Sequence, residues 1–164
     1  MKFLILSCFF LLVNGLTFSQ RKDGVTRVIN VKSDKNTILE TGPDFAASKT
    51  DECYIVDGNE SKGYVEMEFE GINSSKTPQI ITLVVNCADV EYAESSNGLS
   101  VFIDSQKVGN ISQINRNSKA EILLDTNVLK SSNKIMLTLK ANGDDGLYLL
   151  SKKSGYGAYL IVTY

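Results

Sequence analysis

The chain of 164 residues contains no histidine. This absence excludes Ser-His-Asp and Cys-His catalysis and the usual zinc sites, because all of these depend on imidazole. It also leaves no side chain whose unperturbed pKa lies near neutrality for general base catalysis. We therefore expect a protein that is not an enzyme.

Tryptophan is also absent, and neither sign of charge dominates: 17 Lys and Arg residues stand against 19 Asp and Glu residues. Because tryptophan is the strongest stacking side chain, its absence counts against a sugar-binding protein without excluding one. The net charge of −2 is spread along the chain without blocks. This distribution argues against nucleic acid or an anionic membrane as the partner.

One long apolar run, FLILSCFFLLV, follows Met1 and Lys2. It is shorter than the roughly 20 residues needed to span a bilayer, and small residues follow it. This pattern predicts a secretory signal peptide, residues 1–19, with cleavage after Ser19 favoured over cleavage after Gly15. A lipoprotein is disfavoured, because Cys8 lies inside the apolar run. We expect residues 20–164 to form one secreted domain with no membrane span.

Cysteine is scarce as well. Once Cys8 is removed with the signal peptide, only Cys53 and Cys87 are left. In an oxidising compartment a single pair usually forms a disulfide, which we predict here and which requires Cα atoms within about 7 Å. The alternative is two buried free thiols, because a domain of this size can build a core without cross-links.

Alternating apolar residues predict the strands. Residues 81–87 and 99–103 show this period of two on either side of a polar loop, and 63–69 (GYVEMEF) shows it with particular clarity. Such strands bury an apolar face only when further strands pack around them. The predicted core consists of Val65, Met67, Phe69, Ile81, Leu83, Val85, Leu99, Val101, Ile103, Ile122, Leu124, Ile135, Leu137, Leu139, Leu160 and Val162.

About ten short strands, with turn signals at intervals of about 8 to 12 residues, predict an all-β, two-sheet antiparallel sandwich of jelly-roll type. We place the first strands at 25–31 and 37–40. The last, at 158–164, is continuously apolar, which favours burial on both faces or a central place in a sheet. Short helical turns are expected after Asp125 and within 88–95.

Two pairs of carboxylates are candidates for chemistry or metal binding. Glu66 and Glu68 share one strand face about 7 Å apart, within range for an inverting glycosidase, but the pattern is also ordinary for a solvated face, which we favour. Asp144 and Asp145 are candidate calcium ligands, since calcium binds carboxylate and carbonyl oxygens. A plain strand connection has the same composition, so structural calcium is the one cofactor left open.

Tyrosines in or beside predicted loops are better candidates for recognition. Tyr92, Tyr148 and Tyr156 meet this description, and a tyrosine ring can stack on a sugar while nearby polar groups bind its hydroxyls. Several other tyrosines must belong to the core, Tyr159 especially.

Three N-x-Ser sequons begin at Asn59, Asn73 and Asn110, all in predicted loops or at strand ends. A eukaryotic secretory pathway would make them acceptors for N-linked glycans. In a bacterial protein these three asparagines would carry no N-linked glycan.

The order of several segments resembles the DNRLRE-type β-sandwich modules. These are secreted domains similar to carbohydrate-binding modules and often attached to polysaccharide-degrading enzymes. Two features depart from the family: its Thr-Trp step has no counterpart, and Lys152-Lys153 stands where an Arg-Glu pair is common. The resemblance implies a sugar-binding sandwich but transfers no binding residue. It covers most of residues 20–164 through Thr37–Glu40, Gly63–Ile72, Ile81–Asn86, Ser151–Gly155 and Ala158–Tyr164.

These observations predict a secreted, non-catalytic recognition module whose partner is an extracellular polysaccharide or glycoprotein. The alternative is a structural or adhesive extracellular protein whose sheet faces or edges contact other proteins. The sequence predicts no particular oligomeric state.

Overall fold

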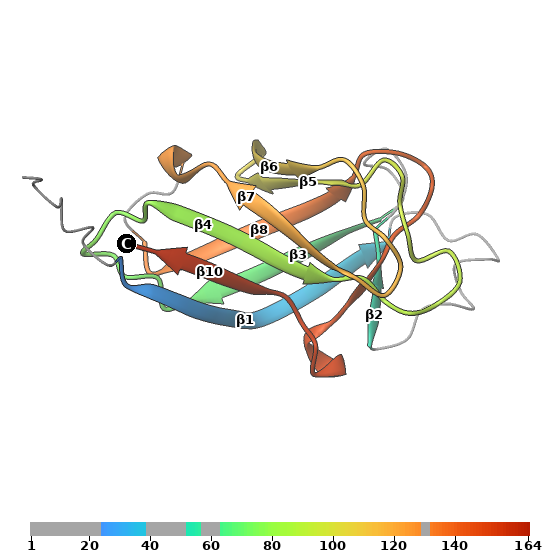
Figure 1. The fold of residues 1–164 in the computed structure, drawn as a ribbon, viewed down its shortest axis with the longest axis horizontal. Helices are drawn as coiled ribbons and strands as arrows, with labels where there is room; N and C mark the ends of the chain where they lie inside the picture. Colours follow the sequence, from blue (N-terminus) through green and yellow to red (C-terminus); the bar gives the residue numbers. More distant parts are fainter. Residues whose placement is uncertain (1–23, 39–51, 57–62, 129–131) are drawn as a thin grey trace, which may run out of the picture.

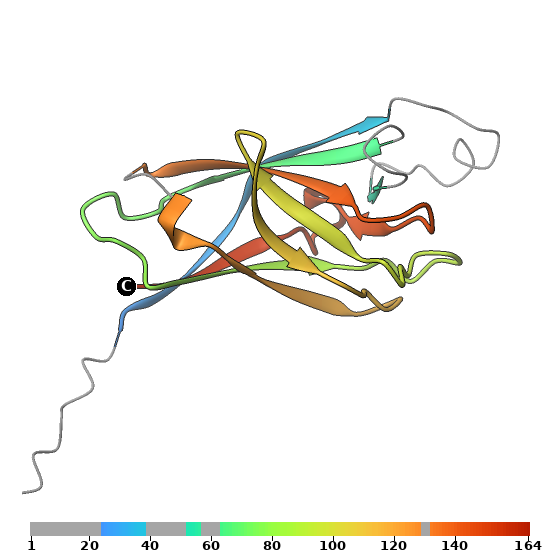
Figure 2. The same ribbon diagram turned by 90° about the horizontal axis from the view of Figure 1, so that it is seen from above.

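The longest strand, β1 (Thr26–Ile38), belongs to both layers of the fold. In the computed structural model, which describes residues 24–38, 52–56, 63–128 and 132–164, its first part pairs with β10 (Tyr159–Thr163) and its second part with β3 (Gly63–Glu70). The register shifts between Val31 and Ser33, so Lys32 forms a β-bulge. A bulge bends a strand and increases its twist. Figure 2 shows β1 passing from one layer to the other.

The sequence-based prediction of separate strands at 25–31 and 37–40 is therefore wrong in the described part of this region. Residues 32–36 are polar and interrupt the apolar pattern, but they continue the strand. Lys35 pairs with Glu66 of β3, and both side chains face outward. A polar run can remain in a strand because one face of an antiparallel sheet is open to solvent.

The first layer, here named the β4 layer, contains four antiparallel strands in the order β1, β10, β4 and β7. The second, the β3 layer, has the order β1, β3, β8, β5 and β6. Figures 1 and 2 show the two layers packed face to face. The strands not yet delimited are β4 (Ile80–Asn86), β5 (Leu99–Ile103), β6 (Gln106–Ile111), β7 (Lys119–Leu124) and β8 (Lys134–Ala141).

A smaller sheet lies at one end of the sandwich. It pairs β2 (Cys53–Ile55) with β9 (Tyr148–Leu150), and the isolated bridge between Cys87 and Leu149 connects it to the end of β4. The remaining elements are the 3-10 turns η1 (Thr126–Val128) and η2 (Lys152–Ser154).

The outer edges of the two layers, β6 and β7, lie against each other. The Asp125 amide donates a hydrogen bond to the Val108 carbonyl over 2.7 Å. A Cβ atom at Gly109 would lie 2.8 Å from Leu124 Cδ2 and 3.1 Å from the Leu123 carbonyl oxygen, so glycine eases the close approach of β6 to β7. The contact covers strand edges that would otherwise invite pairing with another chain.

The core fills the space between the layers. Every predicted core residue is buried except Ile103, which is partly buried and packs against the others. Strand β10 lies between β1 and β4, so the prediction of a central place for the last strand is confirmed. The fold-class prediction, an all-β antiparallel sandwich of jelly-roll type with about ten strands, is also confirmed.

The predicted helical turn after Asp125 is present as η1, whereas residues 88–95 form turns and bends rather than a helix. The predicted signal peptide at 1–19 and the sequon at Asn59 lie outside the described residues. In the described part of the chain, no helix is long and apolar enough to cross a membrane.

Replacing Leu83 by alanine should lower the free energy of unfolding by about 2 to 4 kcal/mol, because the side chain is fully buried between the layers. Urea denaturation followed by intrinsic fluorescence measures this loss. Met136→Ala is the matched control: Met136 is exposed on the outer face of β8, so the change should be about 0.5 kcal/mol or less. Equal effects at the two positions would show that the inward face of β4 is misassigned.

Candidate functional site

Three loops meet at the end of the sandwich where β4 finishes. They are residues 87–98, 112–118 and 142–147, together named the loop end. Asp145 ties two of them together: its carboxylate accepts hydrogen bonds from Ser95 Oγ (2.9 Å), from the Ser96 amide (2.6 Å) and hydroxyl (2.9 Å), and from the Asn97 amide (3.1 Å). One side chain therefore fixes the course of the 87–98 loop.

The protonation of Asp145 reflects these contacts. Burial alone would raise its pKa, but the hydrogen bonds from Ser96, Ser95 and Asn97 outweigh burial and hold the pKa at about 2. The carboxylate is consequently ionised at neutral pH and remains a strong acceptor for all three residues.

The third loop, residues 112–118, is attached to the 87–98 loop by backbone hydrogen bonds and an ion pair. Ser95 and Ile114 exchange two backbone hydrogen bonds, each of 2.9 Å, and the Arg116 guanidinium pairs with Asp89 at 2.8 Å. Gly98 completes the junction: its φ is +66°, and a Cβ atom there would lie 2.1 Å from the Ile111 carbonyl oxygen. The loop end is thus a connected structure rather than three independent loops.

Tyr92 projects from this structure. Its side chain is 71% exposed and its backbone has a φ of 60°, a left-handed conformation that is rare for a bulky residue. The next residue, Ala93, is buried, and its carbonyl accepts bonds from the Tyr148 amide (3.3 Å) and the Cys87 thiol (3.0 Å). A hydrogen bond with the Glu91 carboxylate, together with its negative charge, raises the pKa of Tyr92. The backbone that carries the Tyr92 ring is therefore held in place by the buried contacts of Ala93.

Tyr156 is the second exposed tyrosine, 70% accessible, in the segment between η2 and β10. Its amide donates to Ser154 Oγ (3.0 Å), and its carbonyl accepts from Asn86 Nδ2 (2.6 Å) at the end of β4. Its backbone is held from both sides while its ring faces solvent.

Tyr148, the third tyrosine predicted to bind a ligand, is only 8% exposed and belongs to the core. It lies on β9, whose amide and carbonyl groups bond to Ala93 and Ala88, so its side chain is enclosed by the 87–98 loop. The prediction that Tyr148 forms a binding surface is therefore wrong.

The predicted calcium ligands occupy different environments. Asp144 is exposed, whereas both oxygens of Asp145 already accept hydrogen bonds from the 87–98 loop. Among the described residues, no three His, Cys, Asp or Glu side chains cluster in a way that could hold a metal ion. The contacts of Asp145 give it a role as a tie between loops, and calcium binding stays an untested prediction.

The predicted disulfide between Cys53 and Cys87 is absent, and both thiols are free and buried. Strand β9 explains this difference: Cys53 pairs with Leu150 on one side of β9, and Cys87 pairs with Leu149 on the other. Two strand spacings separate the cysteine backbones by about 9 to 10 Å, beyond the limit of about 7 Å for a disulfide. Sequence spacing gave no sign of the intervening strand.

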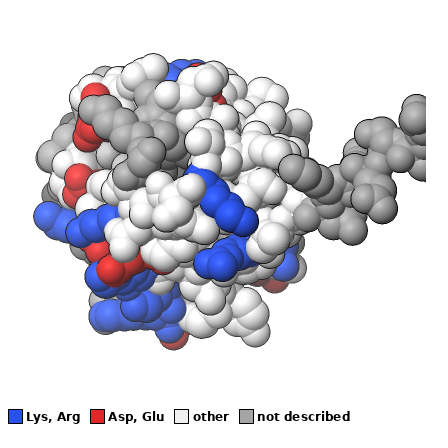
Figure 3. All heavy atoms as spheres, turned by 90° about the vertical axis from the view of Figure 1, so that its left-hand side faces the viewer, with Lys and Arg blue, Asp and Glu red and all other residues white. Residues whose placement is uncertain are grey.

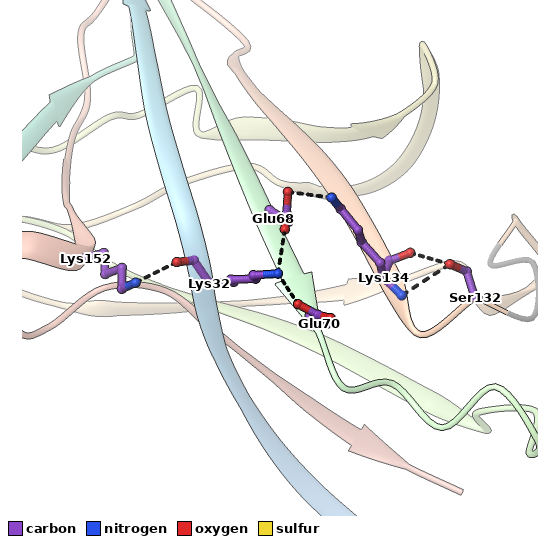
Figure 4. Close-up of polar contacts among 6 residues, drawn as sticks. All are labelled: Lys32, Glu68, Glu70, Ser132, Lys134 and Lys152. Carbon is purple, nitrogen blue, oxygen red and sulfur yellow. Dashed lines mark hydrogen bonds and ion pairs between the residues drawn. The ribbon is translucent and has the colours of Figure 1, made fainter.

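Of the two candidate carboxylates on β3, Glu68 belongs to an ion-pair network on the outer face of the β3 layer (Figure 4). Lys32 pairs with Glu70 and, at 3.5 Å, with Glu68, which also pairs with Lys134 at 2.8 Å. The Lys134 ammonium, foremost by its hydrogen bond, lowers the pKa of Glu68. A glycosidase acid needs a raised pKa, so Glu68 is suited to linking strands rather than to catalysis with Glu66.

The two described sequons differ in the hydrogen bonds that their asparagine side chains make. Asn73 lies in the β3–β4 loop, where its side-chain oxygen accepts a bond from the Ser75 amide (3.0 Å). Asn110 lies in β6, and its side-chain oxygen accepts bonds from Ser100, Lys107 and Asn142. The sequence gave no indication of this polar cluster, because its members come from three separate strands or strand ends.

The opposite end of the sandwich differs from the loop end in its charged side chains. Figure 3 shows Lys and Arg side chains more prominently than Asp and Glu on that face. At the loop end, by contrast, Asp89, Glu91, Glu94 and Asp144 are exposed, and Arg116 is paired. The chain therefore presents an acidic end that carries Tyr92.

No protein-family model matches the chain, and no curated protein matches it. The resemblance to DNRLRE-type modules accordingly stays a prediction. Among solved structures, the chain is similar to the native structure of a family 35 carbohydrate-binding module from Clostridium thermocellum. The two share 16% identity with a TM-score of 0.47, over 84% of this chain and 97% of that chain.

Alkylation should show two free but unreactive thiols. Burial raises the pKa of the Cys87 thiol to about 11, so little thiolate exists at pH 8 and the native protein should react slowly there. In denaturant without reductant, mass spectrometry should find both Cys53 and Cys87 alkylated. Unlabelled cysteines under those conditions would show that they are bridged.

Asp145→Asn should destabilise the protein at neutral pH but not in strong acid. The pKa of Asp145 is about 2 in the folded state and about 3.9 in an unfolded chain. Its contribution is therefore complete above about pH 4 and is lost as the pH falls towards 2. Urea denaturation across this range should show the two proteins converging. Asp144→Asn, at an exposed neighbour, is the control and should change little; a pH-independent difference for Asp145→Asn would contradict the assignment.

Proposed function

We propose that this chain is a secreted, non-catalytic recognition module that binds extracellular glycan at the loop end. One observation carries the proposal: Tyr92 is held with its ring exposed, in a backbone conformation that is costly for a tyrosine. Strain of this kind amounts to about 1 to 3 kcal/mol and persists where the surrounding structure enforces it, commonly at binding sites.

The chemistry of the loop end suits a sugar. An aromatic ring offers a flat apolar face to the C–H groups of a pyranose, while surrounding amides, hydroxyls and carboxylates bind its hydroxyl groups. Asn97, Ser96 and Glu91 are exposed polar residues in the same loop as Tyr92. Because Asp145 and Ser95 fix the loop, little conformational entropy remains to be lost on binding.

Charge narrows the class of glycan. The exposed carboxylates of Glu91 and Glu94 flank Tyr92 in sequence, and that of Asp144 lies on the adjoining loop, whereas Asp89 is paired with Arg116. Anionic sugars such as uronates would be repelled by this end, and the repulsion would be strongest at low salt. We therefore propose a neutral polysaccharide or a neutral glycoprotein glycan as the ligand.

Two variants of Tyr92 test this proposal. Tyr92→Ala should weaken binding to the neutral glycan by about tenfold or more, equivalent to about 1.4 kcal/mol, because the stacking surface is lost. Tyr92→Asn should weaken binding equally while raising the melting temperature, since asparagine tolerates a positive φ. Isothermal titration calorimetry, after a glycan-array screen of neutral and uronic polysaccharides, provides the affinities.

Tyr92→Phe and Tyr156→Ala serve as controls. Tyr92→Phe keeps the ring and should retain most of the affinity, and Tyr156→Ala reports whether the second exposed ring contributes. Absence of binding to every neutral glycan, or unchanged binding by Tyr92→Ala, would contradict the proposal.

A further inference from the structure

Glu91 and Tyr92 lie together at the tip of a tight turn in the 87–98 loop. The Ala93 amide donates a hydrogen bond to the Val90 carbonyl over 3.3 Å, which closes a four-residue turn with Glu91 and Tyr92 as its two central residues. Tyr92 has a φ of 60° at the third position of this turn, where a positive φ usually calls for glycine or asparagine. Both side chains are exposed, so the turn presents them side by side to solvent.

The two side chains are also bonded to each other. The Tyr92 hydroxyl donates to the Glu91 carboxylate, and this bond, together with the negative charge of Glu91, raises the pKa of Tyr92. A carboxylate has about four lone-pair sites, so a single bond leaves most of its capacity to accept hydrogen bonds unused. The pair therefore sets the apolar face of a ring beside a charged acceptor whose position the ring's own hydroxyl fixes.

Other carboxylates of the loop end act elsewhere. Asp89 pairs with Arg116 at 2.8 Å, and both oxygens of Asp145 accept hydrogen bonds from the 87–98 loop. The pKa of the Cys87 thiol is raised by burial and, to a lesser extent, by the charge of Glu94, so Glu94 acts on the buried base of the loop. Glu91 is thus the carboxylate held against the exposed ring.

We propose that Glu91 determines which sugars the loop end accepts, an inference that rests on the proposed binding of glycan at Tyr92. One lone pair of its carboxylate holds the Tyr92 hydroxyl and so orients the ring. The remaining lone pairs accept hydroxyl groups of a neutral sugar stacked on that ring, in charge-assisted hydrogen bonds. The same negative charge disfavours a sugar that carries a carboxylate of its own.

The short distances set the size of this selectivity. A sugar stacked on Tyr92 lies a few ångströms from the ring edge to which Glu91 is bonded. Two like unit charges about 4 Å apart in water repel each other enough to weaken binding about fivefold. Because the Debye length shortens to about 3 Å at 1 M salt, the selectivity should fade at that concentration.

A matched pair of sugars tests the role of Glu91. The probes are the neutral hexose oligosaccharide that binds best in the glycan-array screen and the same oligosaccharide oxidised at one C6 to the uronic acid. Calorimetry at low salt should show that the unsubstituted chain binds the neutral form more tightly. Glu91→Gln should reduce this preference about three- to fivefold and remove most of its salt dependence, because glutamine keeps a carbonyl acceptor for Tyr92 but has no charge.

Glu94→Gln and Asp144→Asn are the matched controls. Each removes one exposed charge of the loop end and leaves the bond between Glu91 and Tyr92 in place. Both variants should therefore keep the preference for the neutral form almost unchanged.

A second measurement needs no sugar. Carbon-13 NMR of the tyrosine rings follows the ionisation of each phenol, and the Tyr92 signal is identified by its loss in Tyr92→Phe. Glu91→Gln should lower the pKa of Tyr92, because both causes that raise it are weakened or removed, and the two control variants should not.

The results separate this inference from the proposed function. If the neutral oligosaccharide binds but Glu91→Gln leaves the preference unchanged, or if either control reduces the preference as much, Glu91 is not the determinant. A Tyr92 pKa that does not respond to Glu91→Gln would also overturn the inference. If the unsubstituted chain binds no neutral oligosaccharide, the proposed function fails as well.

Discussion

The β-bulge at Lys32 is the constraint on which both layers depend. It allows one strand to pair with β10 before it and with β3 after it, so the two sheets share a single continuous backbone. The segment around η2 fastens the bulge: Lys152 Nζ donates to the Lys32 carbonyl at 2.6 Å, and the Val31 amide donates to Ala158 at 3.0 Å. The same segment carries Tyr156, so the bend of β1 also fixes where that ring stands.

Alternation along the chain predicts most of this architecture, since it reports which side of a strand is apolar. Strand β7 shows the rule plainly: Ala120, Ile122 and Leu124 face the core, and the residues between them face outward. The bulge in β1 has no such signature. Its position is determined by partners distant in sequence, so the sequence predicts two separate strands where the polar residues after Val31 in fact continue the strand and pair with β3.

Only the residue types of the candidate site could be predicted from the sequence, not their positions in the structure. Tyr92 and Tyr148 have similar loop-flanking positions in the sequence, yet one projects into solvent and the other is enclosed. The difference comes from β9, which inserts between β2 and the end of β4 and thereby buries Tyr148 and separates Cys53 from Cys87. Asp145 likewise gains a role as a tie between loops, which is visible only once its partners, distant in sequence, are known.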